Sequence, residues 1–244
     1  MLIINADDLG RSKAETDAAL TCFHAGRITS ASLMVFMRDS ERAARLAQAA
    51  HLDVGLHLNF TDHFTVSGCS PGLMDSQRRV ARFLRRNRYA QLVYNPGLRR
   101  AFAESYHAQA AEFARLFGGA SPSHVDGHHH MHLCANMLLS SLVPANTKMR
   151  RNFSFWPSEK SGLNRLYRQG VDRWLSRRYR LPAFFFDLLQ SLQLRRLDRA
   201  LALARTATVE IMTHPVVAAE SEFLLSDQSL VLLQGIKIGS YRRL

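Results

Sequence analysis

The chain has 244 residues, of which 47% are hydrophobic, so it can bury a sizeable core and is expected to form one domain over residues 1–244. It has no apolar run of the roughly eighteen residues that a membrane-spanning helix needs, and its first residues, MLIINADDLG, lack the segments of a signal peptide. These absences predict a cytoplasmic protein, and its three scattered cysteines argue against a disulfide framework.

The chain is strongly basic, with 32 Lys and Arg residues against 20 Asp and Glu residues and a net charge of +12. Much of the excess lies in arginine- and leucine-rich stretches at 76–88, 98–100, 173–180 and 194–205. This pattern is typical of amphipathic helices with a solvated basic face; attraction to anionic lipid headgroups or to an anionic substrate is the alternative. No nucleic-acid-binding motif accompanies the charge, so no nucleic-acid partner is expected.

Short apolar runs alternate with helical patterns along the first half of the chain. The predicted elements are a strand at 2–7, a helix that Ser12 and Glu15 open and Gly26 closes, a strand at 28–36, a helix at 40–50, a strand at 53–60 and a polar loop at 61–75. Alternation of this kind is typical of βα units around a parallel sheet.

The second half continues the alternation, with one poorly patterned region at 144–206. The predicted elements are a helix from about Pro96 to Phe117, a strand at 123–128, a candidate strand at 184–189, a strand at 208–215, a helix at about 219–233 and a closing strand at 235–241. The chain is therefore expected to form an α/β fold, an irregular, TIM-barrel-like (β/α) barrel with fewer than eight strands.

Four polar clusters follow predicted strands: Asp7-Asp8, His57, the run from His124 to His132, and His214. In (β/α) barrels the carboxyl ends of the strands share one rim, where the working residues sit. The four clusters are therefore expected to converge.

The Asp7-Asp8 pair has two readings. An aspartate after a strand can cap the following turn, whereas a buried carboxylate needs a charged partner or a metal ion. The histidines favour the second reading, since Asp8 with two imidazoles would form a two-histidine, one-carboxylate site with open positions for water and substrate. Its neighbour would then be available to take a proton.

In the histidine run, alternation along a strand places His124, Asp126 and His128 on one face. His130 and His132 are expected past the strand end, and at most two imidazoles of the run can bind the metal. The others are left as supporting groups, substrate contacts or solvated residues, with His129 the first candidate for no role.

His214 stands alone in its strand-end motif. An isolated histidine at such a position is more often structural than catalytic, but the predicted strand also carries Glu210 and ends on the shared rim. His214 is therefore kept as a candidate.

The motifs NADDLG (5–10), GLHLN (55–59), SHVDGHHHMH (123–132) and EIMTHP (210–215) resemble, in order and spacing, those of the YdjC-like carbohydrate deacetylase family, which includes chitooligosaccharide and hopanoid-associated deacetylases. The end of the chain resembles the family's closing strand, whereas residues 145–206 match poorly. Leu9 replaces the usual phenylalanine and Val216 the common glycine; both residues flank the site, so these departures bear on the substrate rather than on the reaction.

The resemblance implies a metal-dependent hydrolase that removes the acetyl group from an N-acetylated sugar, an oligosaccharide or a glycolipid, and leaves acetate and a free amine. It implies one divalent metal ion, magnesium or zinc, held by Asp8, His57 and His128. Asp7 would be the general base and His214 the general acid. The family likeness also implies a homodimer.

Two alternatives remain open at the level of sequence. The first is another single-metal hydrolase, of phosphoesters or other amides, for which Arg150 or Arg151 would be the central anion clamp. The second is a non-catalytic barrel that binds polyanions or lipid surfaces, although such a protein has no need of the Asp7-Asp8 pair. The arginine-rich helices also make a peripheral membrane or glycolipid contact a candidate interaction.

Overall fold

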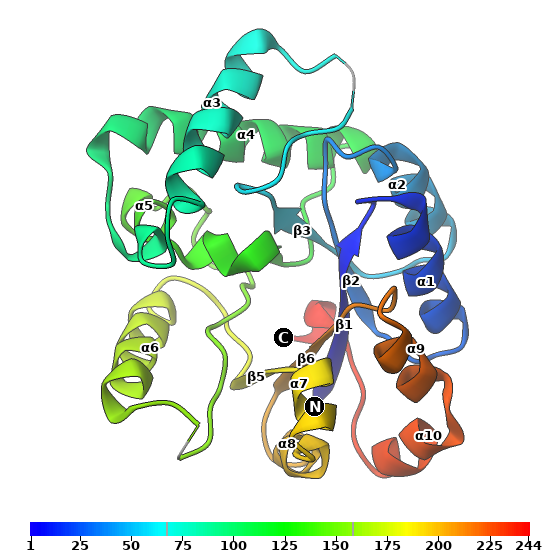
Figure 1. The fold of residues 1–244 in the computed structure, drawn as a ribbon. Helices are drawn as coiled ribbons and strands as arrows, with labels where there is room; N and C mark the ends of the chain where they lie inside the picture. Colours follow the sequence, from blue (N-terminus) through cyan, green and yellow to red (C-terminus); the bar gives the residue numbers. More distant parts are fainter. Residues whose placement is uncertain (67, 158) are drawn as a thin grey trace.

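The fold is built around one curled, six-stranded parallel sheet with the strand order β4-β3-β2-β1-β6-β5 (Figure 1). The computed structural model describes residues 1–66, 68–157 and 159–244. The strands are β1 Leu2–Leu9, β2 Ser30–Leu33, β3 Val54–Leu58, β4 Val125–Gly127, β5 Phe184–Asp187 and β6 Val209–Thr213. The predicted α/β, TIM-barrel-like architecture is confirmed.

Helices surround the sheet (Figure 1). They are α1 Lys13–His24, α2 Ser40–Ala49, α3 Pro71–Leu84, α4 Arg99–Leu116, α5 Ala135–Ser140, α6 Gly162–Leu175, α7 Leu188–Gln193, α8 Leu197–Ala204, α9 Ala218–Leu225 and α10 Asp227–Leu233. Short 3₁₀ helices are η1 Ala90–Leu92, η2 Pro96–Leu98, η3 His128–Leu133 and η4 Tyr241–Arg243. None of the helices in the described ranges has the length and hydrophobicity required to cross a bilayer.

An extended segment, 147–154, spans the opening between the edge strands β4 and β5. Next to β4, the Arg150 amide donates to the Val125 carbonyl at 3.1 Å; next to β5, the Ser154 amide donates to the Phe185 carbonyl at 2.8 Å. These contacts draw the two edges of the sheet together into an irregular barrel. The sequence pattern predicted no element here.

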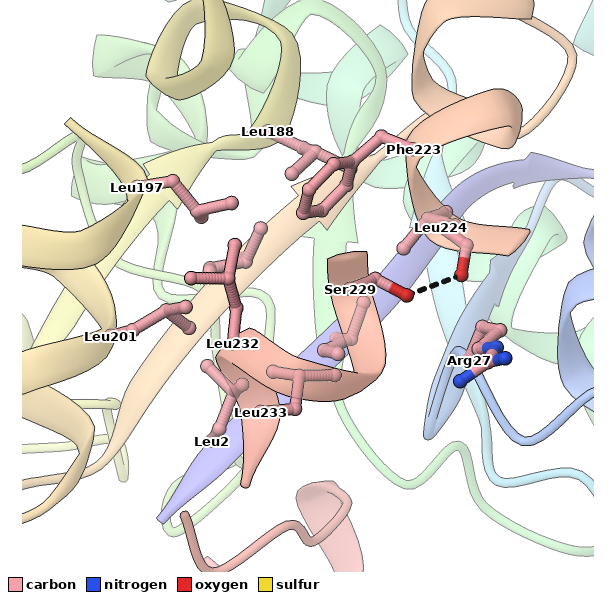
Figure 2. A pocket seen from close by; sticks show the side chains of 12 residues that line it. Leu2, Arg27, Leu188, Leu197, Leu201, Phe223, Leu224, Ser229, Leu232 and Leu233 are labelled. Atoms are coloured by element: carbon pink, nitrogen blue, oxygen red, sulfur yellow. Dashed lines mark hydrogen bonds between the residues drawn. The ribbon is translucent and has the colours of Figure 1, made fainter. Parts of the chain in front are cut away.

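The two faces of the sheet differ in polarity. Toward the helices, Leu2, Ile4 and Ile211 form an apolar layer with the leucines of α8 and α10, around a cavity of only about 20 Å³ (Figure 2). The Ser229 hydroxyl is satisfied within this layer by donating to the Leu224 carbonyl at 2.8 Å (Figure 2). Many of the alternate residues of the strands, such as Asn5, Ser32 and Glu210, are polar and buried, which is unusual for a core and places polar groups in the interior.

Several predicted boundaries were wrong. The strands expected at 28–36 and 184–189 end earlier, at Leu33 and Asp187, and Leu188 begins α7. The loop expected at 61–75 ends early, because Ser70 caps a helix that begins at Pro71. The single helix expected at 219–233 is interrupted at Ser226, whose extended backbone ends α9 and whose hydroxyl caps α10. The strand expected at 235–241 is reduced to one bridge, between Ile238 and Leu2.

Gly55 on β3 provides a test of the packing inside the barrel. A Cβ atom at Gly55 would lie 2.3 Å from Cε1 of His124, so Gly55→Ala must displace this buried ring. We expect a loss of about 1–3 kcal/mol in the free energy of unfolding, measured by urea denaturation. Gly170→Ala in α6 is the control, since nothing lies within 4 Å of that Cβ position, and it should leave stability unchanged or raise it by up to about 1 kcal/mol. Equal stability of the two variants would contradict the packing described here.

Candidate active site

Strand β1 ends in two aspartates whose side chains both reach the barrel interior. The pairing of β1 with β2 shifts register between Ala6 and Leu9, and Asp8 has a left-handed backbone with φ of 63°. Neighbouring side chains of a regular strand point to opposite faces, but a bulge can turn both to the same side. A left-handed backbone is uncommon outside glycine and tends to occur where function requires it.

Asp8, His57 and His128 converge at the carboxyl ends of β1, β3 and β4, as the sequence predicted. Asp8 Oδ1 lies 2.9 Å from His128 Nδ1 and 3.3 Å from His57 Nε2, and all three residues are buried. Burial alone would raise the pKa of Asp8, but hydrogen bonds to the two imidazoles hold it well below its usual range. The carboxylate is therefore ionised at every physiological pH.

This group has the composition and spacing of a cation site. One nitrogen or oxygen atom of each of the three residues lies within 4.8 Å of the others. In addition, His128 Nε2 is buried and makes no hydrogen bond within the described part of the chain, although Asp62 Oδ2 is only 3.3 Å away. A buried, unpartnered ring nitrogen beside carboxylates fits a bound divalent cation, for which imidazole and carboxylate are common ligands.

Asp126 supports His57 from behind. Its Oδ1 lies 2.9 Å from His57 Nδ1, and its Oδ2 accepts a hydrogen bond from Ser32 at 2.8 Å. Burial opposes protonation of His57, yet the charges of Asp126 and Asp7 raise its pKa to about 10. A carboxylate that orients the far nitrogen of an imidazole is a common support for a metal-binding histidine. The structure thus gives a place to Asp126, whose role the sequence left open.

Arg150 holds Asp7 in a bidentate ion pair. Its Nη1 and Nη2 each donate to one Asp7 oxygen at 2.6 Å, while Nε donates to Glu210 at 2.8 Å and Nη2 lies 2.9 Å from Asp126. Arg150 is fully buried, and Asn5 donates a further hydrogen bond to Asp7 at 2.9 Å. The orientation of Asp7 is therefore fixed by two neighbouring side chains.

The charges around Arg150 are unequal, because one guanidinium faces three carboxyl groups. Burial disfavours its charge, but Asp126, Asp7 and Glu210 raise the pKa of Arg150 well above its usual value. Burial also raises the pKa of Glu210 to about 7, although the charge of Arg150 opposes this shift. Tyr241 donates a hydrogen bond to Glu210 and completes the cluster.

The suggestion that Arg150 or Arg151 could clamp a substrate anion is wrong for this structure. Arg150 is fully buried and occupied by its carboxylate partners. Arg151 donates to Asp172, with Nη2 at 2.6 Å from Oδ2. Both guanidiniums are already neutralised by internal partners, and this removes the feature that favoured a phosphoester substrate.

His214 lies directly after β6, with 30% of its side chain exposed. Glu220 Oε2 accepts a hydrogen bond from the His214 backbone amide at 2.9 Å, and Glu220 Oε1 lies 3.7 Å from His214 Nδ1. Burial disfavours the imidazolium, but the hydrogen bond to Glu220 and the charges of Asp7 and Asp8 raise the pKa of His214. This environment favours a protonated ring that is accessible from outside.

The other histidines of the run lie inside the barrel or near its outer opening. His124 stacks on Tyr241 with ring centroids 3.7 Å apart, and His132 lies with Nε2 3.1 Å from the Arg150 carbonyl. Burial lowers the pKa of each to about 4, so both are neutral. As expected, His130 and His132 lie past the strand end, in η3, where His130 packs against Phe153.

Two residues to which the sequence analysis gave no role, Asp62 and His129, lie beside His128. His129, which was assigned no role, lies 2.9 Å from the Thr61 hydroxyl and belongs with Asp62 and His128 to a second possible ligand group. His129 and His130 both have left-handed backbones, with φ of 52° and 59°, so η3 is kinked between strand end and helix. A cavity of about 380 Å³ begins at these two residues.

Comparisons with known proteins show a family and a fold to which the chain is similar. A sequence model of the family described as YdjC-like protein matches residues 1–243. The chain is 29% identical over 217 residues to a chitooligosaccharide deacetylase of Proteus mirabilis (strain HI4320), which covers 88% of this chain and 81% of the relative. It is 33% identical to a chitooligosaccharide deacetylase of Serratia marcescens, over 54% of this chain, and 38% identical to a carbohydrate deacetylase of Geobacillus stearothermophilus, over 53%.

In the Serratia and Geobacillus matches, the chain spans about half the length of the relative, 51% and 49% respectively. A solved structure from Enterococcus faecalis V583, described as a proposed cellobiose-phosphate cleavage protein, has a TM-score of 0.69 and covers 99% of this chain and 97% of its own. At 18% identity, this likeness supports the fold alone.

Loss of the Arg150 charge should be costly. Arg150→Met would leave Asp7, Asp126 and Glu210 buried without their cation, and we expect the free energy of unfolding at pH 8 to fall by about 3–5 kcal/mol in urea denaturation. The loss should be smaller at pH 5, because protonation of buried carboxyl groups relieves their repulsion in the folded state. Arg151→Met, which breaks a partly exposed pair, should cost about 1–2 kcal/mol with little dependence on pH. An equal, pH-independent loss in both variants would argue against the cluster.

Proposed function

The chain belongs to the YdjC-like protein family, and from this membership we propose that it is a hydrolase that removes the acetyl group from an N-acetylated sugar. The products would be acetate and a sugar with a free amine. The relatives named chitooligosaccharide and carbohydrate deacetylases support the substrate class. The observation that carries the proposal is the convergence of Asp8, His57 and His128 beside an ion-paired Asp7.

In this proposal, Asp8, His57 and His128 hold one divalent cation, zinc or magnesium. When bound, such a cation supplies a Lewis acid that polarises a carbonyl oxygen and lowers the pKa of water. Asp126 would keep the His57 ring in the orientation in which Nε2 faces Asp8, through its contact with Nδ1. The orphaned Nε2 atom of His128 supports a cation at this place.

Asp7 would be the general base that takes the proton of the attacking water. Each carboxylate oxygen has two lone pairs, so accepting the Arg150 fork leaves capacity on Oδ2, which lies 4.0 Å from His57 Nε2. Arg150 Nη1 donates to Oδ2, while Arg150 Nη2 and Asn5 donate to Oδ1, so the carboxylate would keep its orientation while the proton moves. A general base must lie within hydrogen-bond reach of its proton, and fixed orientation meets that requirement.

His214 would protonate the departing amine. An amine leaves an acetamide only when it is protonated, and the raised pKa of His214 favours the form that carries the proton. Glu220 would position the ring and stabilise its charge.

The single domain over residues 1–244, the homodimer and the cytoplasmic location stay predictions.

Acetate release from a panel of N-acetylated sugars tests the reaction directly. Protein stripped of metal should be inactive, and re-supply of zinc or magnesium should restore release. Asp7→Asn should keep its bound metal, measured by mass spectrometry of the purified protein, but lose turnover by roughly 10²- to 10⁴-fold. His128→Ala should lose both metal and turnover, because it removes a ligand.

His107→Ala is the matched control, since this histidine is exposed on α4 and should change neither metal content nor activity. Full activity of metal-free His128→Ala protein would rule out the assigned ligand set. Metal binding without acetate release from any sugar would rule out the reaction.

The pH profile of turnover tests His214 separately. Activity should fall at alkaline pH as the His214 imidazolium loses its proton, and the descending limb should lie above the usual histidine pKa, because that pKa is raised. Glu220→Gln removes the charge that favours the imidazolium, so the limb should move to lower pH. An unmoved limb in Glu220→Gln would exclude this pair as the acid. The acidic, ascending limb of the same pH profile should stay where it is in both proteins and serves as the internal reference.

A further inference from the structure

Helix α6 turns an apolar face to the outside of the molecule. Leu163 and Leu166 are 82% and 66% exposed, and Tyr167 and Trp174 are exposed beside them. Their spacing of three, four and eleven residues from Leu163 places them on one side of a helix. Figure 1 shows α6 at the edge of the fold, on the far side from α1 and α9.

The inner side of the same helix is mixed: Leu175 is buried in the core and Val171 packs against it, but the rest of that side is polar. Arg165, Arg168 and Asp172 line a cavity of about 140 Å³ beneath α6, and Asp172 accepts the ion pair from Arg151. A surface helix of a globular protein normally places its leucines toward the core and its charges toward water. Because the leucines at the start of α6 point outward instead, the outer face has the character of a contact surface.

A second apolar edge borders the same cavity as α6. Tyr89, Leu92 and Val93, in and around η1, are each more than half exposed, at 56%, 51% and 54%. Residues of η1 and of α6 both line the 380 Å³ cavity, together with His129 and His130. We call the two edges together the docking face, which consists of Tyr89, Leu92, Val93, Leu163, Leu166 and Tyr167.

Arginines border the docking face. Arg86 and Arg88 precede η1, and Arg173 and Arg177 lie at the end of α6; all four are exposed. None of the four forms a salt bridge to any residue in the described parts of the chain, whereas arginines elsewhere, such as Arg115, do. With a net charge of +12, the surface around the docking face complements an anionic partner.

We propose that the docking face binds the surface of a membrane that contains anionic lipid. The leucine and tyrosine side chains would enter the interface between headgroups and acyl chains, and the bordering arginines would contact the headgroups. A second copy of the chain suits this face less well, because it would bring two arginine borders of the same sign together. The cavity mouth between the two edges would then open onto the bilayer.

This inference does not depend on the proposed chemistry. If the proposed function also holds, N-acetylated sugars displayed at a membrane surface would face the cavity directly. The experiment below measures binding alone, so that its failure leaves the deacetylase proposal untouched.

Flotation of the full chain with lipid vesicles tests the docking face. We expect binding to vesicles of phosphatidylcholine mixed with phosphatidylglycerol, weaker binding at high salt, and little binding to phosphatidylcholine alone. Leu163→Asp/Leu166→Asp should weaken binding on the order of tenfold or more, since it removes apolar contacts and adds negative charge. An unchanged melting temperature would show that the variant is folded.

Leu230→Asp/Val231→Asp is the matched control. It adds the same charge at exposed apolar positions of α10, on another side of the molecule (Figure 1), and should bind vesicles like the unmodified protein. Equal weakening in both variants would mean attraction by net charge and would overturn the docking face. Absence of vesicle binding would also overturn the proposal. If the protein instead self-associates without binding vesicles, and only Leu163→Asp/Leu166→Asp abolishes this self-association, the docking face binds a second copy of the chain.

Discussion

The buried guanidinium of Arg150 is the interaction on which both the barrel and its site depend. It contacts Asp7 of β1, Asp126 of β4 and Glu210 of β6, and it comes from the segment that spans the gap between β4 and β5. Buried carboxylates are tolerated only with partners of opposite charge. The Arg150 guanidinium therefore connects the strands of the barrel and fixes the orientation of Asp7. It also neutralises part of the charge around Asp126, which contacts His57.

The barrel separates its two tasks between the two faces of one sheet. Apolar residues such as Leu2 and Ile211 face the helices and supply the hydrophobic stabilisation, so the interior need not. That interior holds a connected polar network in which Ser32 links Asp126 to His124, and His124 rests on Gly55. A network satisfied in this way is rigid, and rigidity keeps groups that come from four strands at fixed separations.

The sequence predicted the site residues that directly follow a strand, but not those that lie in loops, helices or irregular segments. Asp8, His57 and His128 could be placed together because parallel strands bring their carboxyl ends to one rim. Arg150 could not be placed, since segment 147–154 has no strand periodicity and its charge looks like that of any surface arginine. Asp62 and Glu220 were missed for a related reason: each lies in a loop or helix and acts through contacts that only the folded chain creates. The break at Ser226 could have been read from its capping side chain.

The separation of 143 residues between Arg150 and Asp7 has a consequence for the order of folding. Strands β1 to β4 can pair before residue 150 is in place, but their inward carboxylates then repel one another without a counter-charge. Ordering of segment 147–154 supplies the cation and joins the edge strands in one event. Distant contacts form slowly, and the pairing of β1 with β6 joins residues still farther apart, so the catalytic geometry is expected only after both β6 and segment 147–154 have docked on β1.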